Sequence, residues 1–242
     1  MFYLGSNQPN PTRLNWQQRF KELAHSSRHL LLRQYYQQGL VNPDTPVSET
    51  PIMALDLETT GLDPRQHGIV SIGLVPVQGQ RILNSAAQQW LVKPRFELTN
   101  SSVRVHRITD SALQTAPDLI EILPEFLAAI AGKTLLVHCA DIERRFLTAA
   151  LQVRLGEPLQ FPVIDTMALE AKVHRAKPLS LWQQFRKTPR TSIRLSASRQ
   201  RYGLPPYLPH HAVTDALACA ELFQAQLATR YPPNTPIADL WS

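Results

Sequence analysis

Residues 54–64, ALDLETTGLDP, constrain the fold of this chain more than any other stretch. The apolar run predicts a buried strand, and Asp56 and Glu58, two positions apart, project from the same face of it. Two carboxylates beside a sheet core repel one another and are costly to desolvate, and a bound divalent cation removes both problems. The turn that follows places the pair at a strand end that is open to a ligand. The alternative is an edge strand with a wet polar face, which the strongly apolar opposite face of the run disfavours.

A third acid, Asp215, lies early in the last predicted helix, in HHAVTDALACAEL. Cys219 and Leu222 follow it at helical spacing, so its carboxylate points roughly toward the core side. A carboxylate that faces inward needs a partner, and a metal ion is a suitable one. The alternative is an acid in the first helical turn, where the helix dipole favours negative charge.

The order of the predicted elements indicates an α/β fold. Three consecutive strands with tight links suggest an antiparallel meander, and the later alternation of strand and helix is typical of a mixed sheet flanked by helices. Ahead of them, 12–38 is predicted as helix and 41–50 has the composition of a linker. We expect strands at 51–58, 68–77, 81–92, 133–139 and 161–165, and later helices at 119–132, 142–156, 166–173 and 212–228.

The net charge of +6 is unevenly distributed along the sequence. The window from Ala171 to Thr214 contains nine lysines and arginines and no acid. Such a window suits a polyanion, although on charge alone a solvated loop and helix face explains it equally well. The sequence lacks an apolar run of membrane-spanning length, and its two cysteines fit neither a disulfide framework nor a zinc motif, so we expect a cytoplasmic protein with no membrane partner.

Four motifs, DLETTGL, VHRIT, HCADIERRFL and HHAVTDA, occur in this order along the chain. As a set they resemble the DEDD family of 3′–5′ exonucleases, in its histidine-containing branch, which includes the proofreading (epsilon) subunit of bacterial DNA polymerase III. The resemblance covers residues 51–227. It implies a ribonuclease-H-like mixed sheet and two-metal hydrolysis of the terminal phosphodiester. The predicted domains are then a helical extension over 1–45 and an exonuclease domain over 46–242.

The resemblance also implies roles for individual residues. His210, five positions before Asp215, would be the general base. His211 is interpreted as a solvent residue rather than as a neighbour on the substrate face. Two Mg²⁺ or Mn²⁺ ions suit an all-oxygen site. The implied metal ligands are Asp56, Glu58, Glu143 and Asp215, with Asp56 and Glu58 counted with His210 as catalytic, and the implied substrate contacts are Thr59, Thr60, Leu62 and His106.

The middle motif contains two acids, Asp141 and Glu143. An ungapped match from His138 puts Glu143 where the family usually has aspartate. Helical geometry agrees, because Glu143 shares a face with Phe146 and the following leucine, which pack on the sheet. Asp141 is predicted as the helix N-cap.

We therefore expect a metal-dependent 3′–5′ exonuclease that releases nucleoside monophosphates from single-stranded DNA or RNA 3′ ends. Two alternatives remain open. One is a small-oligonucleotide ribonuclease. The other is a catalytically weakened nucleic-acid-binding scaffold, suggested by the glutamate at position 143. A polymerase or repair partner is expected to bind through the N-terminal extension.

Overall fold

The computed structural model describes residues 14–95, 110–175 and 190–242. Within these residues, six strands form one mixed sheet in the order β3-β2-β1-β5-β6, with β4 also paired to β2. The β1–β2 pair is antiparallel, whereas β1–β5 and β5–β6 are parallel, which confirms the predicted fold class. The strands are β1 (Ile52–Thr59), β2 (Ile69–Gln78), β3 (Arg81–Ile82), β4 (Gln88–Leu91), β5 (Thr134–Val137) and β6 (Val163–Asp165).

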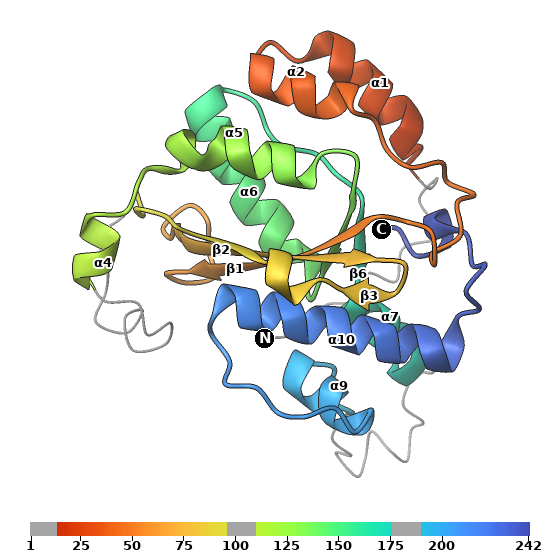
Figure 1. Ribbon diagram of the computed structural model, residues 1–242. Coiled ribbons are helices and arrows are strands. Elements are labelled where there is room, and N and C mark those ends of the chain that lie inside the picture. The colour runs from red at the N-terminus through yellow and green to blue at the C-terminus, as the bar shows by residue number, and fades with distance from the viewer. Residues whose placement is uncertain (1–13, 96–109, 176–189) are drawn as a thin grey trace, which may run out of the picture.

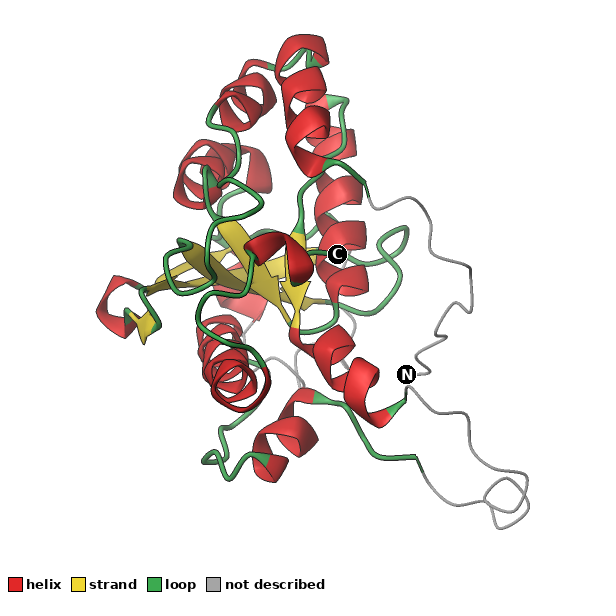
Figure 2. Ribbon diagram, turned by 90° about the vertical axis from the view of Figure 1, so that its right-hand side faces the viewer, coloured by secondary structure: helices red, strands yellow, loops and turns green. Residues whose placement is uncertain are grey.

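Helices cover both faces of this sheet (Figures 1 and 2). The long helix α10 lies across β1 and β2 on one face, and α5 and α6 pack on the other, with α1 and α2 beyond them (Figure 1). None of the helices in the described ranges is long and apolar enough to cross a membrane. The helices are α1 (Trp16–Ser26), α2 (Leu30–Gln37), α4 (Asp110–Gln114), α5 (Leu119–Ile130), α6 (Ala140–Leu155), α7 (Thr166–His174), α9 (Leu195–Arg201) and α10 (Ala212–Arg230), with short 3₁₀ helices η1 (Asn84–Ala86) and η2 (Ile237–Asp239).

Strand β1 divides its side chains between two apolar clusters. Leu55 and Leu57 join the cluster on the α5–α6 face. Ile52 and Ala54 join the cluster beneath α10. Alternation along the strand then directs Asp56 and the next acid toward the α10 side, as the sequence predicts.

Two predicted elements are interrupted. The single strand expected over 81–92 is divided by η1, because Asn84 and its neighbours form local turns in which the Ala87 N–H donates to the Asn84 carbonyl. The helix expected over 12–38 breaks between α1 and α2. At that break the Glu157 carboxylate accepts hydrogen bonds from the N–H groups of Arg28 and His29, at 2.8 and 2.7 Å, and so satisfies a backbone that has left the helix.

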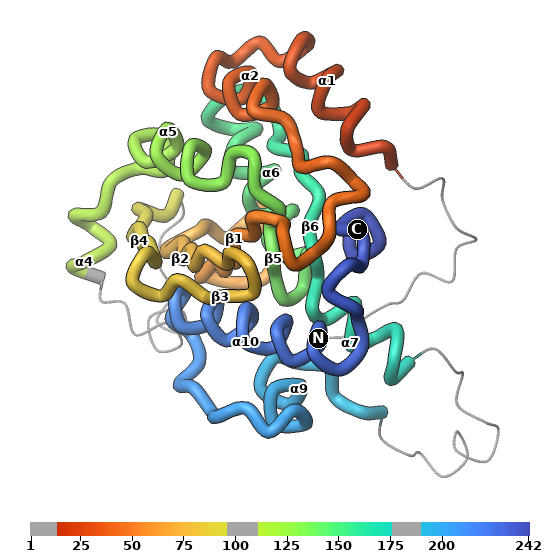
Figure 3. The backbone as a smooth tube through the Cα atoms, turned by 45° about the vertical axis from the view of Figure 1, so that its right-hand side comes forward, coloured from red at the N-terminus to blue at the C-terminus, as the bar shows by residue number. Residues whose placement is uncertain are grey.

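The N-terminal helices share the core of the sheet domain. Phe20, Leu32, Tyr35 and Tyr36 are buried in the same cluster as residues of α5 and α6, and Figures 1 and 3 both place α1 and α2 against these helices. The Tyr36 hydroxyl also accepts a hydrogen bond from the backbone N–H of Gln160, at 2.9 Å. The division into 1–45 and 46–242 stays a prediction.

The segment with linker composition is held in place by the C-terminal segment. The N–H of Val47 donates to the Thr235 carbonyl, and the N–H of Ile237 donates to the Thr45 carbonyl, each at 2.9 Å. Proline-rich composition predicted irregular backbone here correctly. It did not reveal the distant partner that satisfies the hydrogen bonds of this backbone.

Leu32→Ala should lower the free energy of unfolding by about 3 kcal/mol, because it leaves a cavity in a fully buried site. Leu32 has 0% exposure, whereas Leu30, in the same helix, is 60% exposed. Leu30→Ala is therefore the matched control and should change stability by about 0.5 kcal/mol or less. Chemical denaturation of both variants measures this. Equal stability of the two would mean that α2 does not contribute to the core.

Candidate active site

Strand β2 and the last helix, α10, meet at a glycine. Gly73 of β2 pairs with Asp56 of β1. A Cβ at Gly73 would lie 2.3 Å from the carbonyl carbon of Ala212, so only glycine lets the start of α10 approach the sheet this closely. Asp215 lies in the first turn of that helix. The close approach thus brings its carboxylate to the acids of β1.

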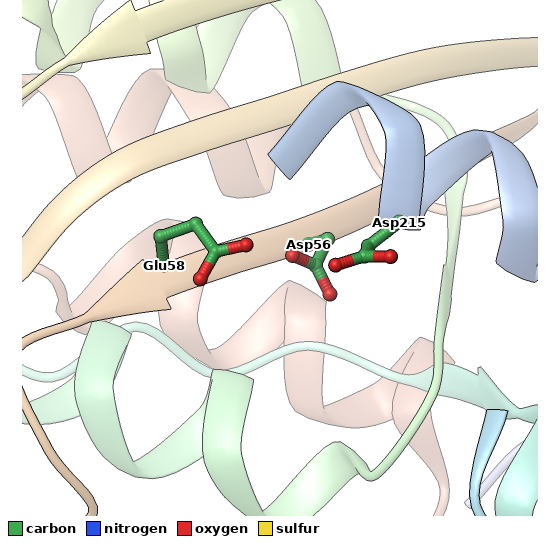
Figure 4. Close-up of side chains that lie close together, drawn as sticks. All are labelled: Asp56, Glu58 and Asp215. Atoms are coloured by element: carbon green, nitrogen blue, oxygen red, sulfur yellow. The ribbon is translucent and has the colours of Figure 1, made fainter. Parts of the chain in front are cut away.

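Three carboxylates gather at this point. Asp56, Glu58 and Asp215 each offer an oxygen within 4.8 Å of the others. Figure 4 shows the first two on the strand and the third on α10, with Asp56 between its neighbours. Glu58 is buried, and the other two are half-buried. Oxygen donors grouped in this way suit a hard divalent cation.

The electrostatics of the cluster favour a bound cation. Burial, together with the charges of Glu58 and Asp215, raises the pKa of Asp56 well above its usual value. Burial also raises the pKa of Asp215, with a further contribution from Glu58. Carboxylates held this close are destabilised as anions, and a divalent cation between them would reverse that penalty.

Glu143 approaches the same cavity from α6. It is 2% exposed, and its Oε2 atom has no hydrogen-bond partner among the described residues. Burial and the charge of Asp56 raise the pKa of Glu143 well above its usual value. A buried carboxylate oxygen without a partner is costly, and a cation beside Asp56 would satisfy it.

The predicted N-cap role of Asp141 is wrong. Helix α6 begins after Cys139, which occupies the N-cap position with a left-handed backbone (φ 91°) and makes no side-chain cap. Asp141 lies inside the first turn, and its side chain points to solvent, where it pairs with Arg145 at 3.3 Å. The helix starts earlier than expected because the Asp165 carboxylate accepts hydrogen bonds from the N–H groups of Cys139 and Ala140, at 3.0 and 3.1 Å.

Glu143→Gln should lower kcat by about 10²-fold, since the variant keeps the shape of the side chain and loses its charge at the cavity. Asp141→Asn, two residues away on the exposed face, is the matched control and should retain activity within about twofold. Steady-state digestion of a labelled oligonucleotide measures both. A larger loss for Asp141→Asn than for Glu143→Gln would reverse the assignment of the two acids.

The two histidines before α10 differ in position. His210 lines the cavity, is exposed, and has a left-handed backbone (φ 70°). Its backbone N–H donates to Asp215 Oδ2 at 2.8 Å, which fixes the loop to the acid. His211 caps α10 through its Nδ1 atom, which accepts from the N–H of Thr214. Non-glycine residues with positive φ are often found at functional sites.

The residues expected to contact substrate are partly described. Thr59, Thr60 and Leu62 line the cavity, and the Leu62 side chain is 62% exposed. The Thr60 hydroxyl accepts from the N–H of Gly68 at 3.0 Å and so holds the turn that carries them. His106 lies outside the described residues.

The cavity also contains residues that the sequence reasoning did not assign to the site. It measures about 530 Å³, and His138 and Arg194 contribute to its wall. His138 Nδ1 lies 2.8 Å from the Thr166 hydroxyl, and burial lowers its pKa to about 4, so this ring is neutral near pH 7. Arg194 was predicted only as one charge of the basic window.

Part of the basic window is buried or paired inside the protein, although its composition indicated a charged surface. Arg199 is 3% exposed and donates to the carbonyl oxygens of Ala218 and Pro205, at 2.7 and 2.8 Å. Arg201 pairs at 2.6 Å with Glu170, which is fully buried. These two arginines fix α9 to α10 and α7.

The mixed sheet with helices on both faces is the ribonuclease-H-like fold class that the sequence predicts. The chain belongs to the exonuclease family, since the family described as Exonuclease (RNase_T) matches residues 53–223. This confirms the enzyme class and the family that the four motifs indicate.

Proteins of similar sequence support the same family. DNA polymerase III subunit epsilon of Treponema pallidum is 31% identical over 181 residues, which make up 75% of this chain and 78% of that protein. The PolC-type DNA polymerase III of Thermotoga maritima is 30% identical over 183 residues, which make up 76% of this chain. The match spans only 12% of that much longer PolC-type protein.

Solved structures share the fold. The nuclease domain of 3′hExo, described as a DEDDh family member bound to rAMP, aligns with a TM-score of 0.61 at 18% identity and covers 76% of this chain and 95% of that one. Exonuclease X in complex with 5′ overhanging duplex DNA aligns with a TM-score of 0.53 at 23% identity, over 78% of this chain and 98% of that one.

Proposed function

We propose that this protein is a metal-dependent 3′–5′ exonuclease that removes nucleoside monophosphates from single-stranded 3′ ends. The observation that carries the proposal is the convergence of four carboxylates, from β1, α6 and α10, on one open cavity that His210 also lines. The substrate is expected to be a nucleic acid, consistent with relatives that are named as DNA polymerase III components.

The donor set fits two divalent cations. Asp56 lies beside Glu58 and Asp215, and its charge also acts on Glu143, so its carboxylate is suited to hold both ions. Glu58 and Asp215 would complete one site. Glu143 would support the other through Oε2, the oxygen that has no partner among the described residues. Oxygen-only ligands favour Mg²⁺ or Mn²⁺ over zinc.

When bound, the ions would neutralise the charge of the scissile phosphate and lower the pKa of a water molecule. His210, which lines the same cavity, would take the proton from the attacking water as general base. The backbone hydrogen bond from His210 to Asp215 would hold the ring beside the acids. Leu62 and the threonines before it would position the terminal nucleotide.

Two other functions remain candidates, and the experiment described below distinguishes them from the proposed one. A small-oligonucleotide ribonuclease would use the same carboxylates on a short substrate. A scaffold would bind nucleic acid without cleaving it, and the buried, converging acids oppose this candidate because a binding surface for a polyanion has no use for them. A polymerase or repair partner that binds α1 and α2 stays a prediction.

The test uses single-stranded DNA and RNA of about 20 nucleotides, and dinucleotides, each labelled at the 5′ end. With Mg²⁺ or Mn²⁺ we expect a ladder that shortens from the 3′ end and disappears in EDTA. Cleavage of dinucleotides alone would favour the small-oligonucleotide ribonuclease. Binding of the long strands without a ladder under either metal would favour the scaffold.

A further inference from the structure

Arg194 is the one lysine or arginine among the described residues that line the acidic cavity. The same wall contains Asp56, Glu58, Glu143 and Asp215. A nucleic acid that enters this cavity brings several phosphates, whereas the acids and their cations neutralise only the phosphate at the scissile bond. A fixed cation on the wall is therefore suited to another phosphate.

The guanidinium of Arg194 is available for a ligand. The residue is exposed at the N-terminal end of α9, and its backbone N–H donates to the Ser192 hydroxyl, a bond that leaves the side chain uninvolved. In the described part of the chain, no ion pair joins its side chain to any of the four carboxylates. An arginine that faces acids without pairing with them keeps its charge free for an incoming anion.

The helix that presents Arg194 is held rigidly. Arg199 and Arg201, on the same helix, are anchored to α10 and to the buried Glu170 as described above. The Tyr202 hydroxyl also donates to Glu170 at 2.9 Å, and Ile193, next to Arg194, is buried. These contacts hold α9 and the residues at its two ends against the rest of the protein, which reduces the entropy lost when Arg194 binds a ligand.

The separation from the acids indicates which phosphate is bound. The scissile phosphate must lie against the cations held by the four carboxylates. Arg194 forms no ion pair with those carboxylates, so its guanidinium is set back from that position. Consecutive phosphates of a strand are one nucleotide apart, and the strand must leave the active site past one of its walls.

We infer that Arg194 binds the backbone phosphate one nucleotide to the 5′ side of the scissile phosphate. This rests on the proposed function. It makes Arg194 a residue that selects strands over single nucleotides. Its contact is sequence-independent, because a phosphate carries no base identity.

The experiment compares two substrates with Arg194→Ala, Arg194→Lys and Arg190→Ala. One substrate is a single-stranded DNA of about ten nucleotides. The other is the p-nitrophenyl ester of thymidine 5′-monophosphate, which has one phosphodiester and no upstream phosphate.

Arg190→Ala is the matched control, because it removes one positive charge from an exposed residue outside the cavity lining. Arg194→Ala should lower kcat/KM on DNA about tenfold and leave kcat/KM on the ester unchanged. Arg194→Lys should retain part of the activity on DNA.

A second readout does not depend on catalysis. Fluorescence anisotropy of the same DNA in EDTA, over a range of salt concentrations, gives the affinity and its salt dependence. Arg194→Ala should reduce the slope of log K against log salt by about 0.7, the value for one phosphate contact on a single strand. This arm decides the inference even if wild type cleaves nothing, an outcome that would count against the proposed function alone.

Three results would overturn the inference. Arg194→Ala could bind and cleave DNA as wild type does. It could lose activity equally on DNA and on the ester, which would place the guanidinium at the scissile phosphate. Arg190→Ala could match Arg194→Ala in both readouts, which would reduce the effect to general electrostatic attraction.

Discussion

Asp56→Asn should lower kcat by about 10³-fold or more and, at the same time, stabilise the metal-free protein. The loss of activity follows because this carboxylate is the one suited to hold both cations, and a bound metal contributes several kcal/mol of transition-state stabilisation, at about 1.4 kcal/mol for each factor of ten. The side chain keeps its size in this variant, so packing is unchanged.

The gain in stability follows from the raised pKa of Asp56. An acid whose pKa is higher in the folded state than in the unfolded state binds more protons when folded. Its contribution to stability is then lost as pH rises above the usual value of 3.8. Asparagine cannot ionise, so near pH 7 the variant escapes this penalty.

Thermal unfolding in EDTA and digestion assays with Mg²⁺ measure the two effects. Asp44→Asn, an exposed acid away from the cavity, is the control and should change neither. A metal-free Asp56→Asn protein that is less stable than wild type would mean that Asp56 already has a stabilising partner.

Gly73→Ala should lower kcat by about 10²-fold or more and reduce thermal stability. A Cβ at this position would lie 2.3 to 2.5 Å from the backbone atoms of Ala212 and Val213, and backbone cannot rotate away as a side chain can. The start of α10 must therefore move, and Asp215 moves with it. A misplacement of about 1 Å at reacting groups is enough for a loss of this size.

Gly68→Ala is the control for this prediction. A Cβ there would be 3.3 Å from the Cβ of Pro94, a tight contact that small shifts accommodate. We expect less than a tenfold loss of activity. Full activity of Gly73→Ala would show that the position of α10 against β2 does not determine the geometry of the acids.

The sequence predicted where the acids lie on their strand better than it predicted the contacts that bring the elements of the candidate site together. Alternation along one strand was enough to place Asp56 and Glu58 on a common face, since period two is a local property. The role of Gly73 was missed because its close contact is with α10, far along the chain. No local pattern distinguishes it from a glycine that merely interrupts a strand.

The errors have the same physical origin. Asp141 was predicted as a cap because it precedes a helical pattern, yet the distant Asp165 accepts the N–H groups that start α6. Arg199 and Arg201 were counted as surface charge because their partners, on α10 and α7, are separated from them in sequence. Tertiary contacts decided each case.

The most direct test of the two-cation site is a calorimetric titration of the metal-free protein with Mn²⁺. We expect two bound ions per chain for wild type, a loss of binding in Asp56→Asn, and a weakened second site in Glu143→Gln. Binding by Asp56→Asn equal to that of wild type, or no binding by wild type at millimolar Mn²⁺, would contradict the claim that these carboxylates form a two-cation site.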